Sequence, residues 1–124
     1  MKLQPDLAEG INVIQHYGAQ GVRVADQWWN HSILLPAQGS VRPWAVDAAP
    51  DLQEAHFAAA LELPCELIIL GSGPKLRFPP PPALAPLMRR RIGLETMDTA
   101  AACRTFNILA AEGRKVLAAL ILPL

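Results

Sequence analysis

Few cysteines, no excess of either charge and no long apolar run limit what this sequence can be. Its two cysteines, Cys65 and Cys103, are too few for a disulfide framework and lack the spacing of metal ligands. We therefore expect two reduced thiols, as in cytosolic proteins. Because the 11 basic and 11 acidic side chains cancel, the chain lacks the positive excess with which nucleic-acid binders attract phosphates, and no nucleic-acid partner is expected.

The sequence also lacks features that direct a protein into or across a membrane. No stretch approaches the roughly 18 apolar residues of a membrane-spanning helix. Residues 1–10 show neither an apolar core nor an Arg/Ser-rich amphipathic pattern, so we expect no signal or transit peptide there. These absences predict a cytoplasmic protein without membrane insertion. Its length predicts a single domain, 1–124, in which residues 1–10 form a loose arm.

Proline and aliphatic residues are plentiful. The 12 prolines indicate many short, stiff connections, and a hydrophobic content of 52% is enough for a sizeable core. Residues 67–70 are four consecutive aliphatics, which predict a strand covered on both faces, typical of a central parallel strand. A Gly-Ser-Gly-Pro turn at 71–74 ends this strand.

Helices and strands alternate in the second half of the chain. Helices are predicted over 50–61, 83–91 and 99–112, and strands over 67–70, 92–97 and 115–122. Asp98 is a good N-cap for the last helix, and Gly113 is its expected C′ residue. This alternation is typical of a layered α/β sheet.

The first half predicts an antiparallel sheet. Segments 12–17 and 21–24 flank a Gly-Ala-Gln turn and indicate a β-hairpin. Residues 32–35 are expected to form a further short strand, ended by Pro36. Residues 41–46 are expected to form an edge strand, because Pro43 cannot donate a hydrogen bond to a central ladder.

Two loops should lie together at the carboxyl edge of the parallel strands, where α/β sheets usually bind ligands. These are the 71–73 and 97–99 loops. The glycine turn is no dinucleotide fingerprint, because a third glycine and the following helix are missing, and it lacks the P-loop spacing. It is either a tight turn leaving a buried strand or an anion site in which Lys75 or Arg77 supplies charge.

No complete catalytic set emerges around these loops. Ser72 lacks the G-x-S-x-G context of a nucleophile elbow, and no histidine can be assigned as its base. Glu95 pairs with a cation (Arg114, Lys75 or Arg77) or faces a polar crevice, and no second carboxylate accompanies it. Asn107 either bonds a loop backbone or faces the same crevice.

Two surface features remain. If Trp28 and Trp29 lie on a strand, their rings face opposite sides, so one of them is exposed and indicates a partner surface. The arginines at 89–91 lie at a predicted helix C-terminus, where the helix dipole favours cations, and the neutral net charge argues against a nucleic-acid patch.

The second half resembles a known family. Leu70-Gly71-Ser72-Gly73 with Phe78-Pro79 looks like its glycine turn, and the segments 92–99, 102–109 and 112–116 look like its long C-terminal signature. The family is a domain of unknown function that includes the mitochondrial respiratory complex I assembly factor numbered three and the adipogenesis-associated cytosolic protein. Since this chain shows no presequence, it looks like a bacterial cytoplasmic member.

The resemblance implies a three-layer α/β fold with a central mixed β-sheet flanked by helices, with the N-terminal antiparallel β-hairpin region added to it. It implies no established catalytic activity, and no cofactor is expected. Positions that match the family suggest a shared cleft. These are Gly71, Gly73, Glu95, Met97, Thr99, Asn107 and Arg114.

Two functions follow. The first is a non-enzymatic protein-interaction or assembly-factor-like domain with a partner surface at Trp28 and Trp29; the apolar content also suggests a homodimer. The alternative is a protein or enzyme that binds a small carboxylate or phosphate between the glycine turn and the start of the 99–112 helix. Asp98 argues against this alternative, because an ionised N-cap repels anions. The residues of the predicted cleft are Gly71, Ser72, Gly73, Lys75, Glu95, Thr99, Asn107 and Arg114.

Overall fold

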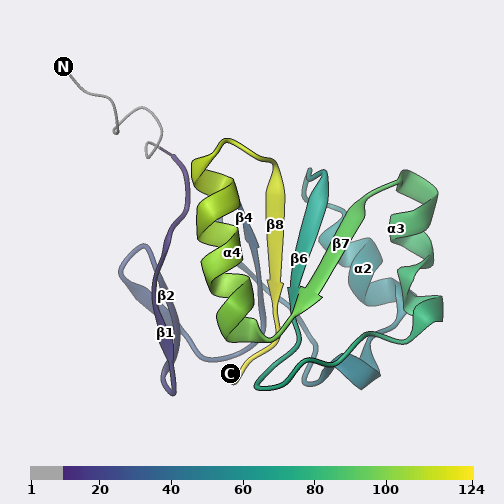
Figure 1. Ribbon diagram of the computed structural model, residues 1–124, viewed down its shortest axis with the longest axis horizontal. Coiled ribbons are helices and arrows are strands. Elements are labelled where there is room, and N and C mark those ends of the chain that lie inside the picture. The colour runs from purple at the N-terminus through teal and green to yellow at the C-terminus, as the bar shows by residue number, and fades with distance from the viewer. Residues whose placement is uncertain (1–9) are drawn as a thin grey trace.

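Two β-sheets of unequal size organise residues 10–124, the part of the chain that the computed structural model describes (Figure 1). The predicted arm falls on residues 1–9, outside the described residues, except for Gly10. The strands are β1 (Ile14–Gly18), β2 (Gly21–Val24), β3 (Gln27–Trp29), β4 (Ile33–Pro36), β5 (Arg42–Pro43), β6 (Leu67–Gly71), β7 (Gly93–Met97) and β8 (Val116–Leu120). The α-helices are α2 (Glu54–Ala60), α3 (Ala85–Arg90) and α4 (Thr99–Ala111), and two 3-10 turns are η1 (Ala49–Asp51) and η2 (Pro81–Leu84).

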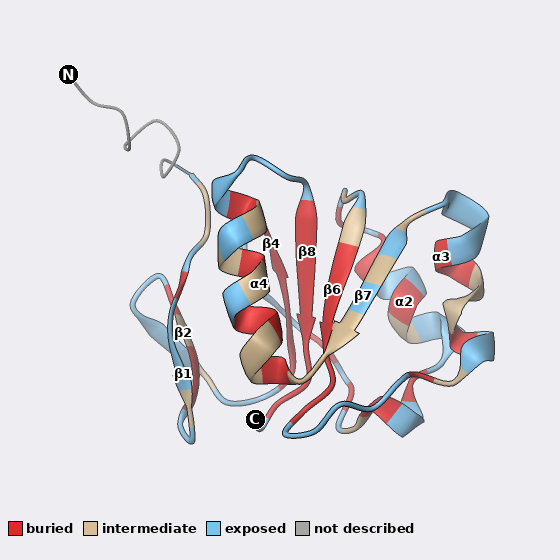
Figure 2. Ribbon diagram, viewed as in Figure 1, coloured by how far each residue is buried: buried red, intermediate tan, exposed pale blue. Residues whose placement is uncertain are grey.

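The larger sheet is mixed and has the strand order β5-β4-β8-β6-β7. Strand β6 pairs in parallel with both β7 and β8, whereas β4 pairs antiparallel with β8 and β5. All five residues of β8 are buried, as a central strand covered on both faces requires (Figure 2). The predicted mixed sheet is confirmed.

Helices cover both faces of this sheet and give it three layers. Alternate residues of β6 enter different cores: Ile69 packs with the inner face of α4, whereas Ile68 and Leu70 pack with α2 and α3 on the other face. In Figure 1, α4 lies in front of the sheet, whereas α2 lies behind it and α3 lies beyond β7 at the right. No helix within residues 10–124 is long and apolar enough to span a bilayer.

The smaller sheet, in the order β1-β2-β3, is antiparallel and stands beside α4. Its inner face contributes Ile14, Val22 and Val24 to the core that α4 shares with β4 and β8. The predicted hairpin is therefore confirmed, and β3 extends it to a third strand.

Two predicted elements are wrong in extent. The helix expected over 50–61 is broken into η1 and α2, because Gln53 adopts an extended backbone conformation and caps α2. The ring of His56 accepts a hydrogen bond from the Gln53 N–H at 2.9 Å, which fixes this start. The strand expected over 41–46 shrinks to Arg42–Pro43, because the chain turns inward to bury Trp44 and Val46.

Candidate functional site

Thr99 closes the space in which a ligand cleft was predicted. Its side chain is fully buried at the start of α4. The Thr99 Oγ1 atom accepts a hydrogen bond from the Gly73 N–H at 2.8 Å and donates one to the Ile121 carbonyl at 2.8 Å. The Thr99 N–H in turn donates to the Gly73 carbonyl at 2.9 Å. The glycine turn and the helix start are thus bonded to each other, and no cleft opens between them.

The glycine at position 71 makes this close approach feasible. A Cβ atom there would lie 2.9 Å from both the Thr99 Cα and the Thr99 Oγ1. Real Cβ contacts are longer, so any side chain at this position would push α4 away from β6. Gly71 therefore serves helix–strand packing and does not cradle a phosphate.

Ser72 holds the loop that follows the turn. Its hydroxyl is buried, accepts a hydrogen bond from the Arg77 N–H at 3.0 Å, and lies 2.7 Å from the Lys75 carbonyl and 3.1 Å from the Met97 carbonyl. A hydroxyl has one proton, so it donates to one of these two carbonyls at a time. Each recorded partner is a backbone group, and none is a catalytic base.

A shallow cavity of about 240 Å³ lies on the other side of the glycine turn. Of the eight residues of the predicted cleft, Ser72, Gly73 and Lys75 line it. Its charged lining residues are Lys75, Arg77 and Asp47, of both signs. Asp47 forms no recorded ion pair with Lys75 or Arg77 across this cavity.

The structure distributes the remaining cleft residues over the molecule. Asn107 lies on the side of α4 that faces the small sheet, where its Oδ1 accepts from the Ile14 N–H at 2.8 Å and its Nδ2 donates to the Ile14 carbonyl at 2.9 Å. Arg114 forms its ion pair with Glu66, with 3.1 Å between Nε and Oε1, and not with Glu95. Glu95 is exposed on β7, and no cation among residues 10–124 pairs with it.

The placement of Asn107, Arg114 and Glu95 corrects the prediction of one cleft. Asn107 does not face a crevice at the carboxyl edge, because it is bonded to β1. Arg114 follows α4 and lies at the opposite edge of the sheet, beside the start of β6. The eight predicted residues therefore do not form one site.

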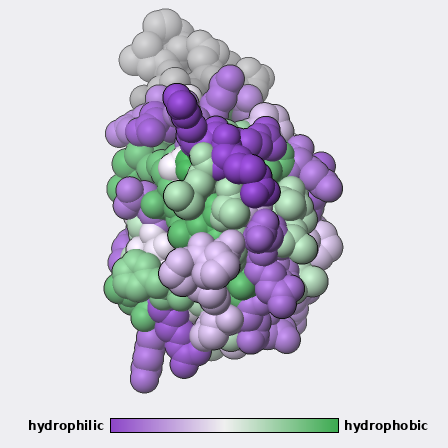
Figure 3. Space-filling view, turned by 90° about the vertical axis from the view of Figure 1, so that its right-hand side faces the viewer, coloured by the Kyte–Doolittle hydropathy of each residue, from purple (hydrophilic) through white to green (hydrophobic). Residues whose placement is uncertain are grey.

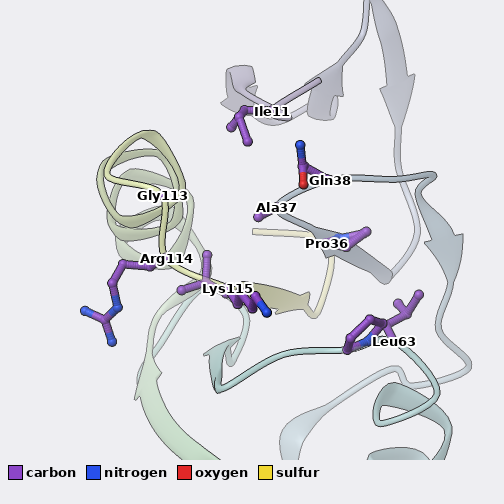
Figure 4. A pocket seen from close by; sticks show the side chains of 10 residues that line it. Ile11, Pro36, Ala37, Gln38, Leu63, Gly113, Arg114 and Lys115 are labelled. Atoms are coloured by element: carbon purple, nitrogen blue, oxygen red, sulfur yellow. The ribbon is translucent and has the colours of Figure 1, made fainter. Parts of the chain in front are cut away.

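A second cavity, of about 280 Å³, opens at that opposite edge between the end of β4, the start of β8 and the segment before β6 (Figure 4). Its lining is mainly apolar. In Figure 4 the guanidinium of Arg114 points away from the cavity. Its lining consists of Ile11, Pro36, Ala37, Gln38, Leu63, Pro64, Gly113, Arg114, Lys115 and Val116. This lining includes no hydroxyl, thiol, imidazole or carboxylate side chain.

The thiols are unreactive for a physical reason. Cys103 is fully buried on the inner face of α4, and this burial raises the pKa of its thiol to about 12. Burial also raises the pKa of Cys65. Neither supplies a thiolate near neutral pH. Within residues 10–124, no three His, Cys, Asp or Glu side chains are grouped so that they could hold a metal ion.

The small sheet carries an aromatic outer face, which we define as His16, Arg23 and Trp28; these residues lie opposite one another across its three strands. Tyr17 pairs with the buried Val22 and therefore lies on the other side, toward α4. Trp28 remains 42% exposed, and its ring stacks on that of His16 with 6.4 Å between centroids. Trp29, the next residue of β3, turns inward and packs against the core under α4. Arg104 of α4 donates a hydrogen bond to the Tyr17 hydroxyl at 3.0 Å. Sequence patterns do not reveal Tyr17 and Arg104 as partners, because their contact joins positions that are 87 residues apart.

The family can now be stated. Residues 14–121 match the family described as "Protein of unknown function (DUF498/DUF598)". The chain belongs to this family. The resemblance noted in the sequence is confirmed, because the curated relatives of this DUF498/DUF598 chain include NADH dehydrogenase (ubiquinone) 1 alpha subcomplex assembly factor 3 of Mus musculus. That protein is 33% identical over 124 residues, which cover 98% of this chain and 65% of the mouse protein.

Bacterial structures share the fold of this DUF498/DUF598 chain. A crystal structure of a Bordetella parapertussis protein matches with a TM-score of 0.87 and 33% identity, covering 94% of this chain and 99% of that one. An NMR structure of a Xanthomonas campestris protein matches with a TM-score of 0.78 and 38% identity over 89% of this chain and 83% of that one. Against the curated mammalian relatives the coverage is lower: the chain spans 60% to 66% of their length.

Proposed function

We propose that this chain is a non-enzymatic protein-interaction domain of the assembly-factor kind, and that the aromatic outer face of the small sheet contacts the partner. One observation carries the proposal: Trp28 stays 42% exposed although Trp29 beside it is packed inward. Tryptophan and arginine, both present on this face, are among the residue types that most often dominate binding energy at protein interfaces.

The small sheet holds this face in a fixed shape. Two residues of the β2–β3 turn, Ala25 and Asp26, have φ angles of 52° and 62°, a conformation that costs free energy for side chains other than glycine. Gln15 supports the turn: its Oε1 accepts from the Asp26 N–H at 2.9 Å and its Nε2 donates to Asp26 Oδ1 at 3.0 Å. A preformed surface loses little conformational entropy on binding.

The mouse relative is named an assembly factor, which supports a role in binding other proteins. The bacterial relatives and the free thiols support a cytoplasmic protein of a bacterium. The alternative function, binding of a small anion between the glycine turn and the start of α4, receives no support, because Thr99 and Gly73 fill that space with their mutual hydrogen bonds.

Affinity capture with quantitative mass spectrometry tests the proposal. Tagged wild type, Trp28→Ala and the matched control Ile108→Ala are compared in the cells that produce the chain. Ile108 is 60% exposed on α4, away from the outer face, so its truncation also removes exposed apolar surface. We expect Trp28→Ala to lower recovery of a specific partner at least tenfold, because interface tryptophans typically contribute 2 kcal/mol or more, while Ile108→Ala leaves recovery unchanged.

Two results would contradict the proposed function. Equal recovery by wild type and Trp28→Ala would exclude the outer face as the contact surface. Loss of recovery in both variants would mean that the effect is not specific to this face. Thermal unfolding of each variant shows whether the fold is intact before recovery is compared.

A further inference from the structure

Strand β7 leaves one edge of the large sheet open. It is the last strand in the order β5-β4-β8-β6-β7, and each of its five residues is exposed or half-buried. In Figure 1 it lies at the far end of the molecule from the small sheet. It is therefore a different surface from the one in the proposed function.

The backbone groups at this edge are available for bonding. The Gly93 N–H donates to the Glu66 carbonyl at 3.2 Å, and the Met97 carbonyl accepts from the Ser72 N–H at 2.8 Å, so the odd-numbered residues of β7 direct their backbone toward β6. Because successive residues of a strand alternate, Leu94 and Thr96 direct their N–H and C=O groups outward. No hydrogen bond recorded within residues 10–124 reaches these outward groups. An edge of this kind is a template for an added strand.

Glu95 gives this edge a charge. Its strand partner Ile69 faces the α4 side of the sheet, so Glu95 also points to that side, where its exposed carboxylate has no cation among the described residues. On the opposite face, Leu94 packs partly against the core of α2 and α3, and Met88 of α3 is 73% exposed. Figure 3, which looks at this end of the molecule, shows hydrophobic residues gathered in the middle with hydrophilic ones around them.

The position of Glu95 disfavours a second copy of the chain as occupant. If two copies paired antiparallel through β7 in the register that uses both outward-facing residues, Leu94 would bond Thr96 of the second copy. The two Glu95 side chains would then stand directly opposite each other, and like charges in that position are destabilising. The same geometry favours a strand that carries a cation opposite Glu95.

We propose that β7 is the docking site for an extended segment of a partner protein, which adds as a sixth strand and places a lysine or arginine opposite Glu95. Residues flanking that cation alternate to the other face and are apolar, where they meet Leu94 and the exposed Met88. Two nearby arginines of α3 do not neutralise Glu95, because they bind elsewhere: Arg89 pairs with Glu54 at 3.7 Å and Arg90 donates to the Leu61 carbonyl at 3.3 Å.

Amide hydrogen exchange measured by NMR tests this docking site. The probes are two acetylated, amidated synthetic peptides, Ser-Thr-Val-Lys-Val-Thr-Ser and the same peptide with glutamate in place of lysine. We expect the lysine peptide, at a concentration that occupies nine-tenths of the sites, to slow exchange of the Leu94 and Thr96 amides about tenfold, because a tenth of the sites stays open. The inward amide of Glu95, already bonded in the sheet, provides the internal control.

Charge reversal makes the experiment selective. In the Glu95→Lys variant, the glutamate peptide should protect the same two amides and the lysine peptide should lose its effect. Three outcomes would overturn the proposal: no protection by either peptide, equal protection of wild type by both, or protection that rises with protein concentration without peptide, which would make a second copy the occupant. If Glu95→Lys does not fold, the comparison of the two peptides on wild type still decides.

Discussion

The most direct test of the closed carboxyl edge is the substitution Thr99→Val. Valine keeps the branched shape of threonine but replaces its hydroxyl with a methyl group. The change therefore removes the two hydrogen bonds that Thr99 Oγ1 makes, one from the Gly73 N–H and one to the Ile121 carbonyl. The Gly73 N–H and the Ile121 carbonyl would then lack this partner at a buried site, since Thr99 has no exposed surface.

The expected loss follows from these two groups. A buried polar group without a partner costs about 1–3 kcal/mol, so we expect Thr99→Val to lower the free energy of unfolding by about 3 kcal/mol. For a domain of 124 residues this corresponds to a melting temperature about 10 °C lower. Thr99→Ser keeps the hydroxyl and should recover most of this loss.

Urea unfolding followed by tryptophan fluorescence measures the effect, with Thr105→Val as the control on the same helix. The Thr105 hydroxyl contacts a weak acceptor, the Met97 sulfur at 3.3 Å, so its loss should cost less than about 1 kcal/mol. Amide exchange at Gly73 should also become faster in Thr99→Val. If Thr99→Val is as stable as wild type to within about 0.5 kcal/mol, the carboxyl edge is open and our account of it is wrong.

Three further predictions address other contacts. Gly71→Ala should lower the free energy of unfolding by about 1–3 kcal/mol in urea, because its Cβ would meet the first residue of α4 at 2.9 Å, whereas Gly18→Ala, whose Cβ meets nothing within 4 Å, should change little. Asn107→Ala should speed amide exchange at Ile14 at least tenfold, because that N–H loses its bond to Oδ1. Burial raises the pKa of the Cys103 thiol from 9.0 to about 12, so its stabilising contribution is complete below pH 9 and is lost as pH rises toward 12, by up to about 4 kcal/mol. Urea midpoints across this pH range should fall more steeply for wild type than for Cys103→Ala; equal slopes would refute the assignment.

Much of the fold could be predicted because its signals are local. The α4 helix begins after Asp98, whose side chain accepts from the Ala101 N–H at 2.9 Å, and ends before Gly113 with a φ of 85°. Each of these two residues marks an end of the helix through contacts or backbone geometry within one helical turn. The parallel pairing of β6 and β7 follows from the continuous aliphatic run and the short helical connection between the strands.

The candidate site could not be predicted in the same way, because its contacts join distant segments. Thr99 looks like an ordinary first residue of a helix, yet its hydroxyl joins groups 26 and 22 positions away. The sequence offered Arg114, Lys75 and Arg77 as partners for Glu95, but the register of β6 against β8 brings Arg114 to Glu66 instead. A sequence pattern places residues at an edge of the sheet but does not show whether side chains fill the space between them.

The place of β8 in the large sheet has a consequence for how the chain folds. Strand β8 follows every other described strand in the sequence, yet it lies between β4 and β6 and is their sole link in the sheet. During synthesis the β5–β4 pair and the β6–β7 pair leave the ribosome as separate halves, each with an aliphatic edge exposed. The two pairs form one sheet only when Val116–Leu120 inserts between them, so the large sheet cannot be completed before this segment has been synthesised.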